Sequence, residues 1–221
     1  MNTGAKDVLY RVRYFFIPYL IVICACLIIK LLYTREHIYF TINGLYSEWG
    51  DFVAPYITDL GDGITIVIVT LLLALYSYRR AFLLISSYAL TSLTAQILKY
   101  SFDSPRPRIY FEKELDKIHF VKGLYILAVH SFPSGHTVTA FSAGIVLTYL
   151  VKNKKWGMLL LLLAMLIGYS RMYLSQHFFE DVTVGSVVGV VVTVLWLSFI
   201  NGKEFLKSPR WNRGIIKGLN F

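Results

Sequence analysis

"SRMYLSQHFFED", residues 170–181, places four ionisable side chains between two long apolar runs. These side chains are Arg171, His177, Glu180 and Asp181. A charge beside hydrocarbon is costly, and charges that a chain keeps at such positions usually serve a function. The stretch therefore indicates a junction between two membrane-spanning helices that carries a functional site.

Six apolar runs, including the two that flank this stretch, are long enough to cross a bilayer, where a helix needs roughly 20 residues. The chain has 221 residues, of which 56% are hydrophobic and 16% charged, and a mean hydropathy of +0.58, which excludes an ordinary soluble domain. We predict an all-α, integral membrane six-transmembrane-helix bundle with spans near residues 14–34, 62–78, 81–99, 134–151, 156–173 and 181–200. No internal repeat or soluble linker separates the spans, so residues 1–221 are predicted to form a single domain.

Two connections on one side of the predicted bundle are long, and those on the other side are short. Residues 35–61 mix aromatic and acidic side chains, which favours one or two short helices lying in the membrane interface. Residues 100–133 contain Pro105, Pro107 and a run of charges. The long connections leave room for a site, and we expect it on their side.

Basic residues are concentrated on the side of the short connections and the termini. That side carries thirteen basic and two acidic residues, whereas the opposite side carries nine basic and eleven acidic residues. The positive-inside rule therefore predicts cytoplasmic termini. The thirteen basic residues are Lys6, Arg11, Arg13, Arg79, Arg80, Lys152, Lys154, Lys155, Lys203, Lys207, Arg210, Arg213 and Lys217. Because they are scattered among short turns, with no aromatic-lined soluble domain, the net charge of +9 does not indicate nucleic-acid binding.

His177 and Asp181 lie four residues apart at the predicted start of the sixth span. This spacing places both side chains on one helix face, where the carboxylate accepts a hydrogen bond from one ring nitrogen and leaves the other nitrogen basic. Such a pair is typical of an activated nucleophile or a general base. A structural ion pair is the alternative, and the spacing alone does not exclude it.

Pro133-Ser134-Gly135-His136 immediately precedes the apolar fourth span. Ser134 is a candidate N-cap, and Gly135 lets an oxyanion approach the free backbone N–H groups of a helix start. His136 is then placed over that anion. An ordinary helix start after a turn is the alternative.

Three cations complete the pattern. Lys99 ends the third span, Arg106 lies between two prolines, and Arg171 ends the fifth span. Each is separately explained as a snorkelling or loop charge. Together they supply one point charge and two planar forks, which suit a phosphate. One hypothesis covers all these features: an oxyanion is held by the cations and the helix start, between two histidines.

These residues resemble, in order and internal spacing, the three signature motifs of the type 2 phosphatidic acid phosphatase superfamily, which also includes glucose-6-phosphatase and the vanadium haloperoxidases. The matching residues are Lys99-x(6)-Arg106-Pro107, Pro133-Ser134-Gly135-His136 and Ser170-Arg171-x(5)-His177-x(3)-Asp181. Residues 1–98 match the superfamily only in general layout.

The resemblance implies metal-independent hydrolysis of a phosphate monoester or diphosphate, without a cofactor. In this chemistry His177, oriented by Asp181, attacks phosphorus and forms a phosphohistidine, while His136 donates a proton to the leaving oxygen. The residues that hold the phosphate oxygens are Lys99, Arg106, Ser134, Gly135 and Arg171.

The positions of the motifs at the ends of spans predict a site at the outer membrane–water boundary of the cytoplasmic membrane. The compact size and the family resemblance imply that this membrane is bacterial. We expect a lipid phosphate substrate: undecaprenyl diphosphate, phosphatidic acid, phosphatidylglycerol phosphate or a lipid A phosphate.

Three other functions are considered. A metal site also uses histidines and carboxylates, but three nearby cations repel a divalent ion. A transporter or flippase binds phospholipid headgroups through the same cations without hydrolysis, and needs neither a nucleophile backed by Asp181 nor an acid. A haloperoxidase-like activity is the remaining branch of the superfamily, and a membrane bundle is the wrong setting for it.

Overall fold

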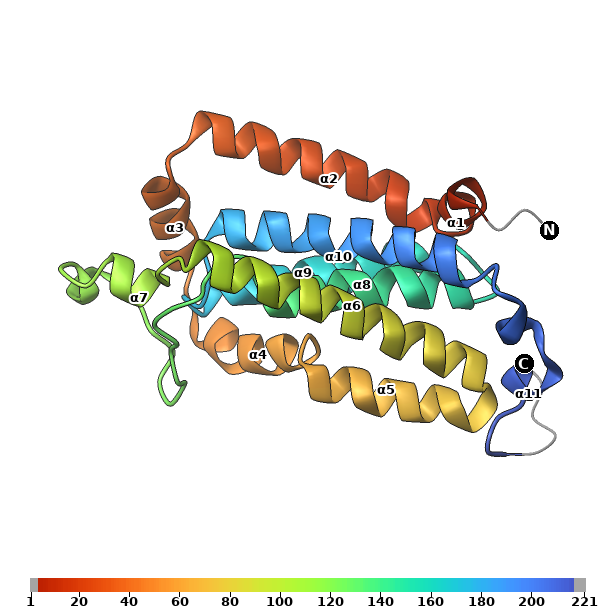
Figure 1. Cartoon of the computed structure of the whole chain (residues 1–221). Coiled ribbons are helices and arrows are strands. Elements are labelled where there is room, and N and C mark those ends of the chain that lie inside the picture. Colours follow the sequence, from red (N-terminus) through yellow and green to blue (C-terminus); the bar gives the residue numbers. More distant parts are fainter. Residues whose placement is uncertain (1–3, 217–221) are drawn as a thin grey trace.

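The computed structural model describes residues 4–216 as a bundle of helices (Figure 1). The long helices are α2 (Arg13–Leu32), α5 (Gly63–Tyr76), α6 (Tyr78–Phe102), α8 (Gly135–Leu150), α9 (Trp156–Tyr173) and α10 (Phe179–Ile200). The shorter ones are α1 (Ala5–Arg11), α3 (Arg35–Asn43), α4 (Glu48–Asp59), α7 (Pro107–Tyr110), η1 (Leu115–Lys117), η2 (Glu204–Lys207) and α11 (Pro209–Asn212). No strand occurs within residues 4–216, and the all-α prediction is confirmed.

Each of the six predicted spans corresponds to one of the long helices. Four of these are long and apolar enough to cross a membrane by themselves: α2, α6, α9 and α10. A fifth span is counted if α4 and α5, which meet at a bend of 53°, are taken together. The chain is thus a membrane protein with four or five apolar spans by this measure, and the predicted number of six is approximate.

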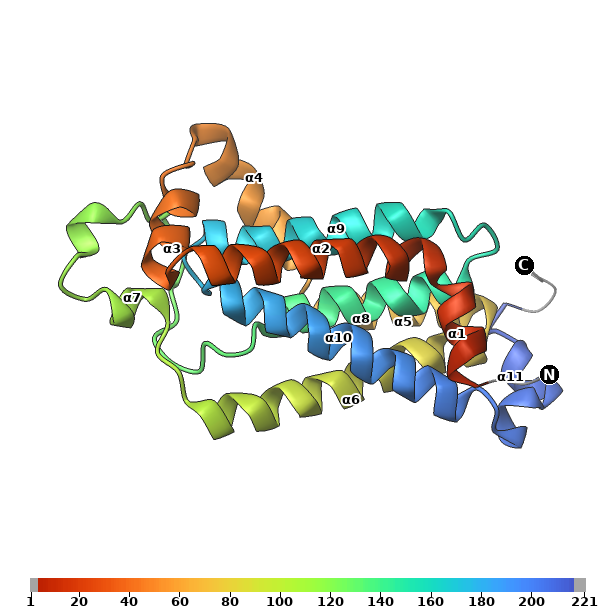
Figure 2. The ribbon, with the colours of Figure 1, turned by 90° about the horizontal axis from the view of Figure 1, so that it is seen from above.

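The helix α8 has 16 residues and lies inside the bundle. It packs against α6, α9 and α10, and eleven of its residues are buried. Glycines allow the close approach: a Cβ atom added to Gly189 of α10 would lie 2.6 Å from the carbonyl oxygen of Val138. Figure 2 shows α8 enclosed between neighbouring helices. A helix that its neighbours cover does not need the full length of a lipid-exposed span.

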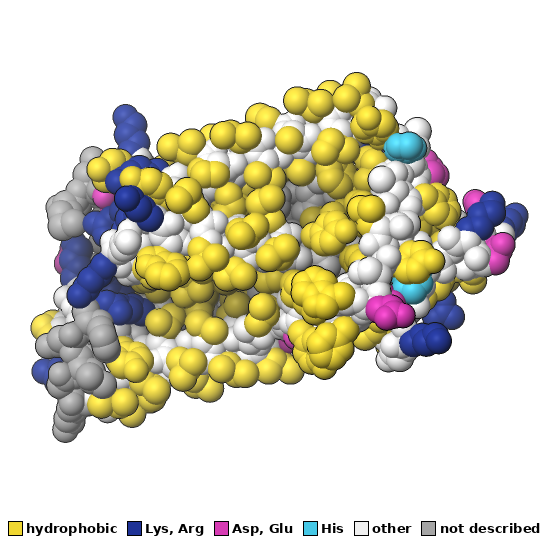
Figure 3. All heavy atoms as spheres, turned by 180° about the vertical axis from the view of Figure 1, so that it is seen from behind, with side chains coloured by type: hydrophobic (Ala, Val, Ile, Leu, Met, Phe, Trp, Pro, Cys, Tyr) yellow, Lys and Arg dark blue, Asp and Glu magenta, His cyan; other side chains and the backbone are white. Residues whose placement is uncertain are grey.

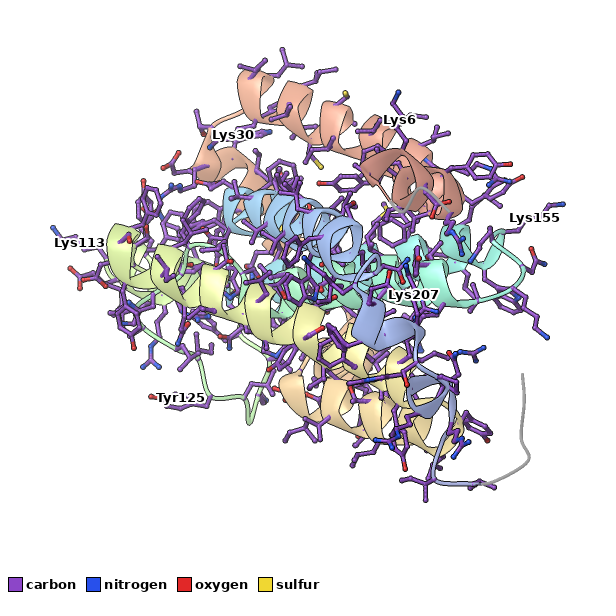
Figure 4. The ribbon with its side chains drawn as sticks, turned by 45° about the vertical axis from the view of Figure 1, so that its right-hand side comes forward. Lys6, Lys30, Lys113, Tyr125, Lys155 and Lys207 are labelled. Carbon is purple, nitrogen blue, oxygen red and sulfur yellow. The ribbon has the colours of Figure 1, made fainter. Side chains whose placement is uncertain are left out.

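The outer surface separates into an apolar belt and two polar ends. Hydrophobic side chains cover the long sides of the bundle, whereas Lys and Arg gather at the end that carries the termini (Figure 3). Lys6 and Lys155 lie at that end, and Lys113 lies at the opposite end (Figure 4). Lys217, which belongs to the predicted basic side, lies outside the described residues.

The end opposite the termini is built from α3, α4, α7 and the loops around them (Figure 1). The predicted segment 35–61 forms two short helices, whose first turns are capped by the hydroxyls of Thr34 and Ser47. Aromatic side chains of α4 remain exposed, with Trp49 at 73% and Phe52 at 66%. Such a rim is typical of a membrane interface.

Candidate active site

The eight residues singled out in the sequence converge at the end opposite the termini. Lys99 comes from the end of α6, and Arg106 is the residue before α7. Ser134, Gly135 and His136 form the start of α8. The remaining three, Arg171, His177 and Asp181, lie at the end of α9, in the following turn and in the first turn of α10. The helix ends thus bring together eight residues that are spread over more than eighty positions of the sequence, and these ends lie on one side of the bundle (Figures 1 and 2).

His177 lies at the centre of this group and is only 1% exposed. Its Nδ1 lies 3.4 Å from Oδ2 of Asp181, and its Nε2 lies 3.2 Å from a terminal nitrogen of Arg106. Burial, followed by the charges of Arg106 and Arg171, lowers the pKa of His177 well below its usual 6.5. The ring is therefore neutral at physiological pH, with one nitrogen facing a carboxylate and the other facing a cation.

The sequence interpretation placed His177 and Asp181 on one face of a helix, and this detail was wrong. His177 precedes α10, which begins at Phe179. Asp181 is instead fixed by the start of the helix, where its Oδ2 accepts the backbone N–H of Phe178 at 2.9 Å. The turn after α9 then brings the imidazole to the same carboxylate oxygen. His177 and Asp181 still lie together, because Asp181 is held by its capping bond to the start of α10 and His177 is brought to it by the turn after α9.

Ser131 is a site residue that the sequence analysis missed. Its hydroxyl donates to Oδ2 of Asp181 at 2.5 Å and lies 3.4 Å from Nδ1 of His177. The side chain is completely buried, and its backbone N–H donates to the carbonyl of Ser104 at 2.9 Å. Ser131 therefore holds the carboxylate that holds the histidine. The only signal in the sequence is its place two residues before Pro133, which no physical rule connects to Asp181.

Arg106 is fixed from three directions and is only 4% exposed. Its Nε donates to the carbonyl of Val129 at 2.9 Å, and one terminal nitrogen donates to the carbonyl of Gln176 at 2.9 Å. Gln176, also missed in the sequence, adds its side-chain oxygen at 3.3 Å. The guanidinium is thus held rigidly against His177.

Arg171 retains an unused donor. One terminal nitrogen donates to the hydroxyl of Thr58 at 2.8 Å, and the side chain is 6% exposed, yet its Nε is buried without a hydrogen-bond partner. A buried guanidinium with an unpaired N–H is costly unless an anion binds to it. Arg171 is therefore suited to an oxyanion ligand.

Lys99 and the start of α8 lie together. The ammonium of Lys99 donates to the carbonyl of His130 at 2.7 Å. A Cβ added to Gly135 would meet only Cε of Lys99, at 3.9 Å, so the glycine leaves open space beside the cation. Ser134 is the N-cap residue as predicted, but its side chain makes no capping bond and instead accepts a hydrogen bond from the Thr137 hydroxyl at 2.9 Å.

A cavity of about 340 Å³ opens beside His136. Its Nε2 lies 3.7 Å from Oδ2 of Asp62, in the turn between α4 and α5. The cavity is lined by Gly61, Asp62, Gly63, Tyr88, Ser92, Ala95, Gln96, Lys99, Gly135, His136 and Thr139. These residues come mainly from α6 and α8, with the turn before α5, so the polar site is continuous with a space between the helices.

The arrangement offers a phosphate several cationic donors, a glycine at a helix start and two imidazoles. One imidazole is neutral and backed by a carboxylate, as a nucleophile requires. The other lines a cavity large enough for a small polar group. This combination suits a nucleophilic displacement at a phosphate group.

Residues 80–205, which include all eight of these residues, match the family model of the PAP2 superfamily. The chain belongs to the PAP2 superfamily. An undecaprenyl-diphosphatase of Sulfolobus acidocaldarius is 26% identical over 168 residues, which are 73% of this chain and 69% of that protein. The bacitracin transport permease protein BcrC of Bacillus licheniformis is 40% identical over 78 residues, which are 33% of this chain and only 37% of that protein's length.

A solved structure shares the fold of this PAP2 protein. The crystal structure of LpxE from Aquifex aeolicus has a TM-score of 0.66 and 29% identity, and the match covers 74% of this chain and 94% of that one. The family resemblance read from the three motifs is therefore confirmed.

Proposed function

We propose that this PAP2 protein is a membrane lipid phosphatase that hydrolyses a phosphate monoester or diphosphate of a lipid through a phosphohistidine. The observation that carries the proposal is the environment of His177, whose neutral ring is held between Asp181 and Arg106 next to the other cations. A protein that only binds phosphate has no need of a neutral imidazole backed by a carboxylate.

The first step breaks the bond between phosphorus and the leaving oxygen. Nε2 of His177 attacks phosphorus, and Asp181 stabilises the positive charge that develops on the ring. The electron pair of the broken bond goes to the leaving oxygen, which receives a proton from His136. The lipid product then departs, and the phosphoryl group remains on His177.

The second step releases inorganic phosphate. His136, now deprotonated, takes a proton from water as the water oxygen attacks phosphorus. The P–N bond breaks and its electron pair returns to Nε2, so both histidines recover their starting states.

The cations bind the phosphoryl oxygens throughout both steps. Arg171 supplies its unpaired Nε–H, and Lys99 supplies a point charge beside Gly135. The backbone N–H of Gly135 and the hydroxyl of Ser134 complete the set at the start of α8. Charge stabilisation of this kind supplies most of the catalysis in phosphoryl transfer.

A lipid is the substrate class that fits the position of the site. The motif residues lie at the ends of apolar helices, and the cavity beside His136 continues between α5 and α6. The relative from S. acidocaldarius is named an undecaprenyl-diphosphatase, which makes a polyprenyl diphosphate the first candidate. Phosphatidic acid, phosphatidylglycerol phosphate and a lipid A phosphate are the others. The charge distribution favours a site at the outer face of a bacterial cytoplasmic membrane.

A lipid headgroup-binding transporter or flippase is the second candidate, because the relative from B. licheniformis is named a transport permease. Transport explains the cations equally well. It does not explain the Ser131–Asp181–His177 network.

The test is phosphate release by the purified protein in detergent from each of the four candidate lipids. We expect at least one lipid to yield inorganic phosphate, with inhibition by vanadate and no loss after exhaustive chelation. His177→Ala is expected to abolish release while the protein still folds. The absence of release from every lipid by folded protein would favour the transporter.

A further inference from the structure

Asp62 lies in the turn between α4 and α5 and uses its two carboxylate oxygens differently. Oδ1 accepts the backbone N–H of Ile64 at 2.8 Å and caps α5. Oδ2 lies 3.7 Å from Nε2 of His136. The Asp62 side chain is 44% exposed and lines the cavity that His136 also lines. One side chain therefore both starts a helix and faces the second histidine of the site.

The other charges around His136 are positive. These cations are Arg171 on α9, Arg106 before α7 and Lys99 on α6. His177 adds no favourable charge, because its own ring is neutral.

Asp62 is the carboxylate that lies against this ring, with its Oδ2 at 3.7 Å from Nε2. Two further carboxylates of the site serve other groups. Asp59, three residues earlier, acts on Arg171, as does Asp62 itself. Asp181 is bound by the Ser131 hydroxyl and a backbone N–H on the side of His177. Asp62 is thus the carboxylate placed to pair with a protonated His136, at 3.7 Å from its Nε2.

Gly61, the residue before Asp62, allows the turn to lie close to His136. A Cβ added to Gly61 would lie 2.6 Å from Cγ2 of Ile167, 3.1 Å from the carbonyl oxygen of His136 and 3.2 Å from its Cβ. No side chain fits in that space, so the turn packs directly against the backbone of the histidine. The packed structure therefore holds the backbone of the turn, and with it Asp62, next to His136.

We propose that Asp62 is a positioning residue that orients His136 toward the leaving oxygen and stabilises the protonated form of its ring, as Asp181 orients His177. The inference rests on the proposed phosphatase function, because it concerns the proton that His136 gives to the lipid product. In the first step that proton moves from His136 to the leaving oxygen, and the Asp62–His136 ion pair becomes a contact between a carboxylate and a neutral ring. In the second step the proton taken from water restores the pair.

The test variant is Asp62→Asn, which keeps a good N-cap and nearly the same shape but removes the charge. Two substrates are compared in the purified protein: phosphatidic acid, whose leaving oxygen needs a proton, and p-nitrophenyl phosphate, whose leaving group departs without one. We expect kcat for phosphatidic acid to fall about 10- to 100-fold, with little change for p-nitrophenyl phosphate. The basic limb of the rate profile for phosphatidic acid is expected to move to lower pH, and Asp62→Glu is expected to restore part of the rate.

A double-mutant comparison identifies the residue through which Asp62 acts. In a His136→Ala background, Asp62→Asn is expected to cause no further loss. The matched control is Asp51→Asn, because Asp51 also pairs with a histidine on this end, with 2.8 Å between Oδ2 and Nε2 of His119, but lies outside the cavity beside His136. For Asp51→Asn, both limbs of the pH profile for phosphatidic acid are expected to stay at their wild-type positions.

The outcomes separate the two proposals. If the wild-type protein releases phosphate and Asp62→Asn slows both substrates equally, or adds its full effect to His136→Ala, the role of Asp62 is wrong and the phosphatase stands. If wild-type protein releases phosphate from neither substrate nor from the other candidate lipids, the proposed function fails, and the role of Asp62 fails with it. A folding defect is recognised by the thermal transition, and Asp62→Ser, which also caps the helix, then replaces Asn.

Discussion

At the scale of single residues, the site is a set of buried polar groups that hold one another in place. Oδ2 of Asp181 faces three partners: the Ser131 hydroxyl, a backbone N–H and the ring of His177. Arg106 is held by backbone carbonyls rather than by carboxylates, so its charge remains available. A network with this many fixed partners is already organised before a substrate arrives, and organisation of this kind is what lowers a reaction barrier.

Ser131 provides a direct test of that organisation. We expect Ser131→Ala to lower kcat about 10- to 100-fold, because a hydrogen bond to a charged group is worth about 1.5–3 kcal/mol. KM is expected to change little, since the hydroxyl faces Asp181 and not the substrate. Ser131→Thr keeps the hydroxyl and is expected to retain more activity. Ser101→Ala, which removes a hydroxyl bonded at 2.8 Å within its own helix, serves as the control. Unchanged kcat in folded Ser131→Ala would contradict this role.

The buried state of His177 has a consequence for pH dependence. The proposed nucleophile is the neutral ring of His177, and burial lowers the pKa of this ring well below its usual 6.5. The neutral form is therefore lost only when the pH falls through that lowered value. We expect the acid limb of kcat/KM, which reports the free enzyme, to lie well below pH 6.5. An acid limb at or above 6.5 would show that the ring is not buried as described.

The eight residues named from the sequence lie together, but their supporting partners were not predictable. Motif spacing identifies groups that carry chemistry, such as His177 and Arg171. It does not identify Ser131, Gln176 or Asp62, whose contacts arise from turns that meet only after the helices pack. A serine or an aspartate in a loop has many possible partners, and periodicity does not choose among them.

At the scale of helices, glycines set the distances on which the site depends. A Cβ added to Gly185 of α10 would lie 2.9 Å from the carbonyl oxygen of Ser134, and Gly189 approaches α8 one turn further along. Because α10 carries Asp181 and α8 carries His136, the separation of the two helices sets the distance between these two side chains.

Gly189→Leu tests this packing. We expect a loss of about 1–3 kcal/mol in stability from overpacking, observed as a lower thermal transition in detergent, together with reduced turnover. The control is Val191→Leu, which enlarges a side chain that is 47% exposed on the same helix. Equal transition temperatures for Gly189→Leu and wild type would mean that α8 and α10 do not pack as described.

Hydropathy predicts helix positions well and helix boundaries less well. The predicted span 156–173 has the bounds of α9, whereas α6 begins at Tyr78, three residues before the predicted start. The difference arises because Arg79 and Arg80 precede the apolar run but belong to the first turn of α6. Arg79 donates to the side chain of Asn201, a partner that the sequence does not reveal. Hydropathy marks the break between α4 and α5 at residues 59–63 but does not give its angle of 53°.

At the scale of the whole molecule, the bundle has a strongly basic end with the termini and a mixed end with the site (Figure 3). The positive-inside rule turns this asymmetry into an orientation. In a variant without Cys24 and Cys26, we expect Lys113→Cys to react with a membrane-impermeant maleimide in intact cells. Lys155→Cys, exposed at the opposite end, is expected to react only after permeabilisation. The reverse pattern would place the site in the cytoplasm.

The most direct test of the central claim is to trap the phosphorylated protein. Purified protein is mixed with a lipid labelled in its terminal phosphate, quenched rapidly under alkaline conditions that preserve phosphohistidine, and mapped by mass spectrometry. We predict one modified residue, His177, with no label in His177→Ala and accumulation of label when His136 is replaced and the substrate is p-nitrophenyl phosphate. Phosphate release at the wild-type rate by His177→Ala, or label on another side chain, would contradict the account.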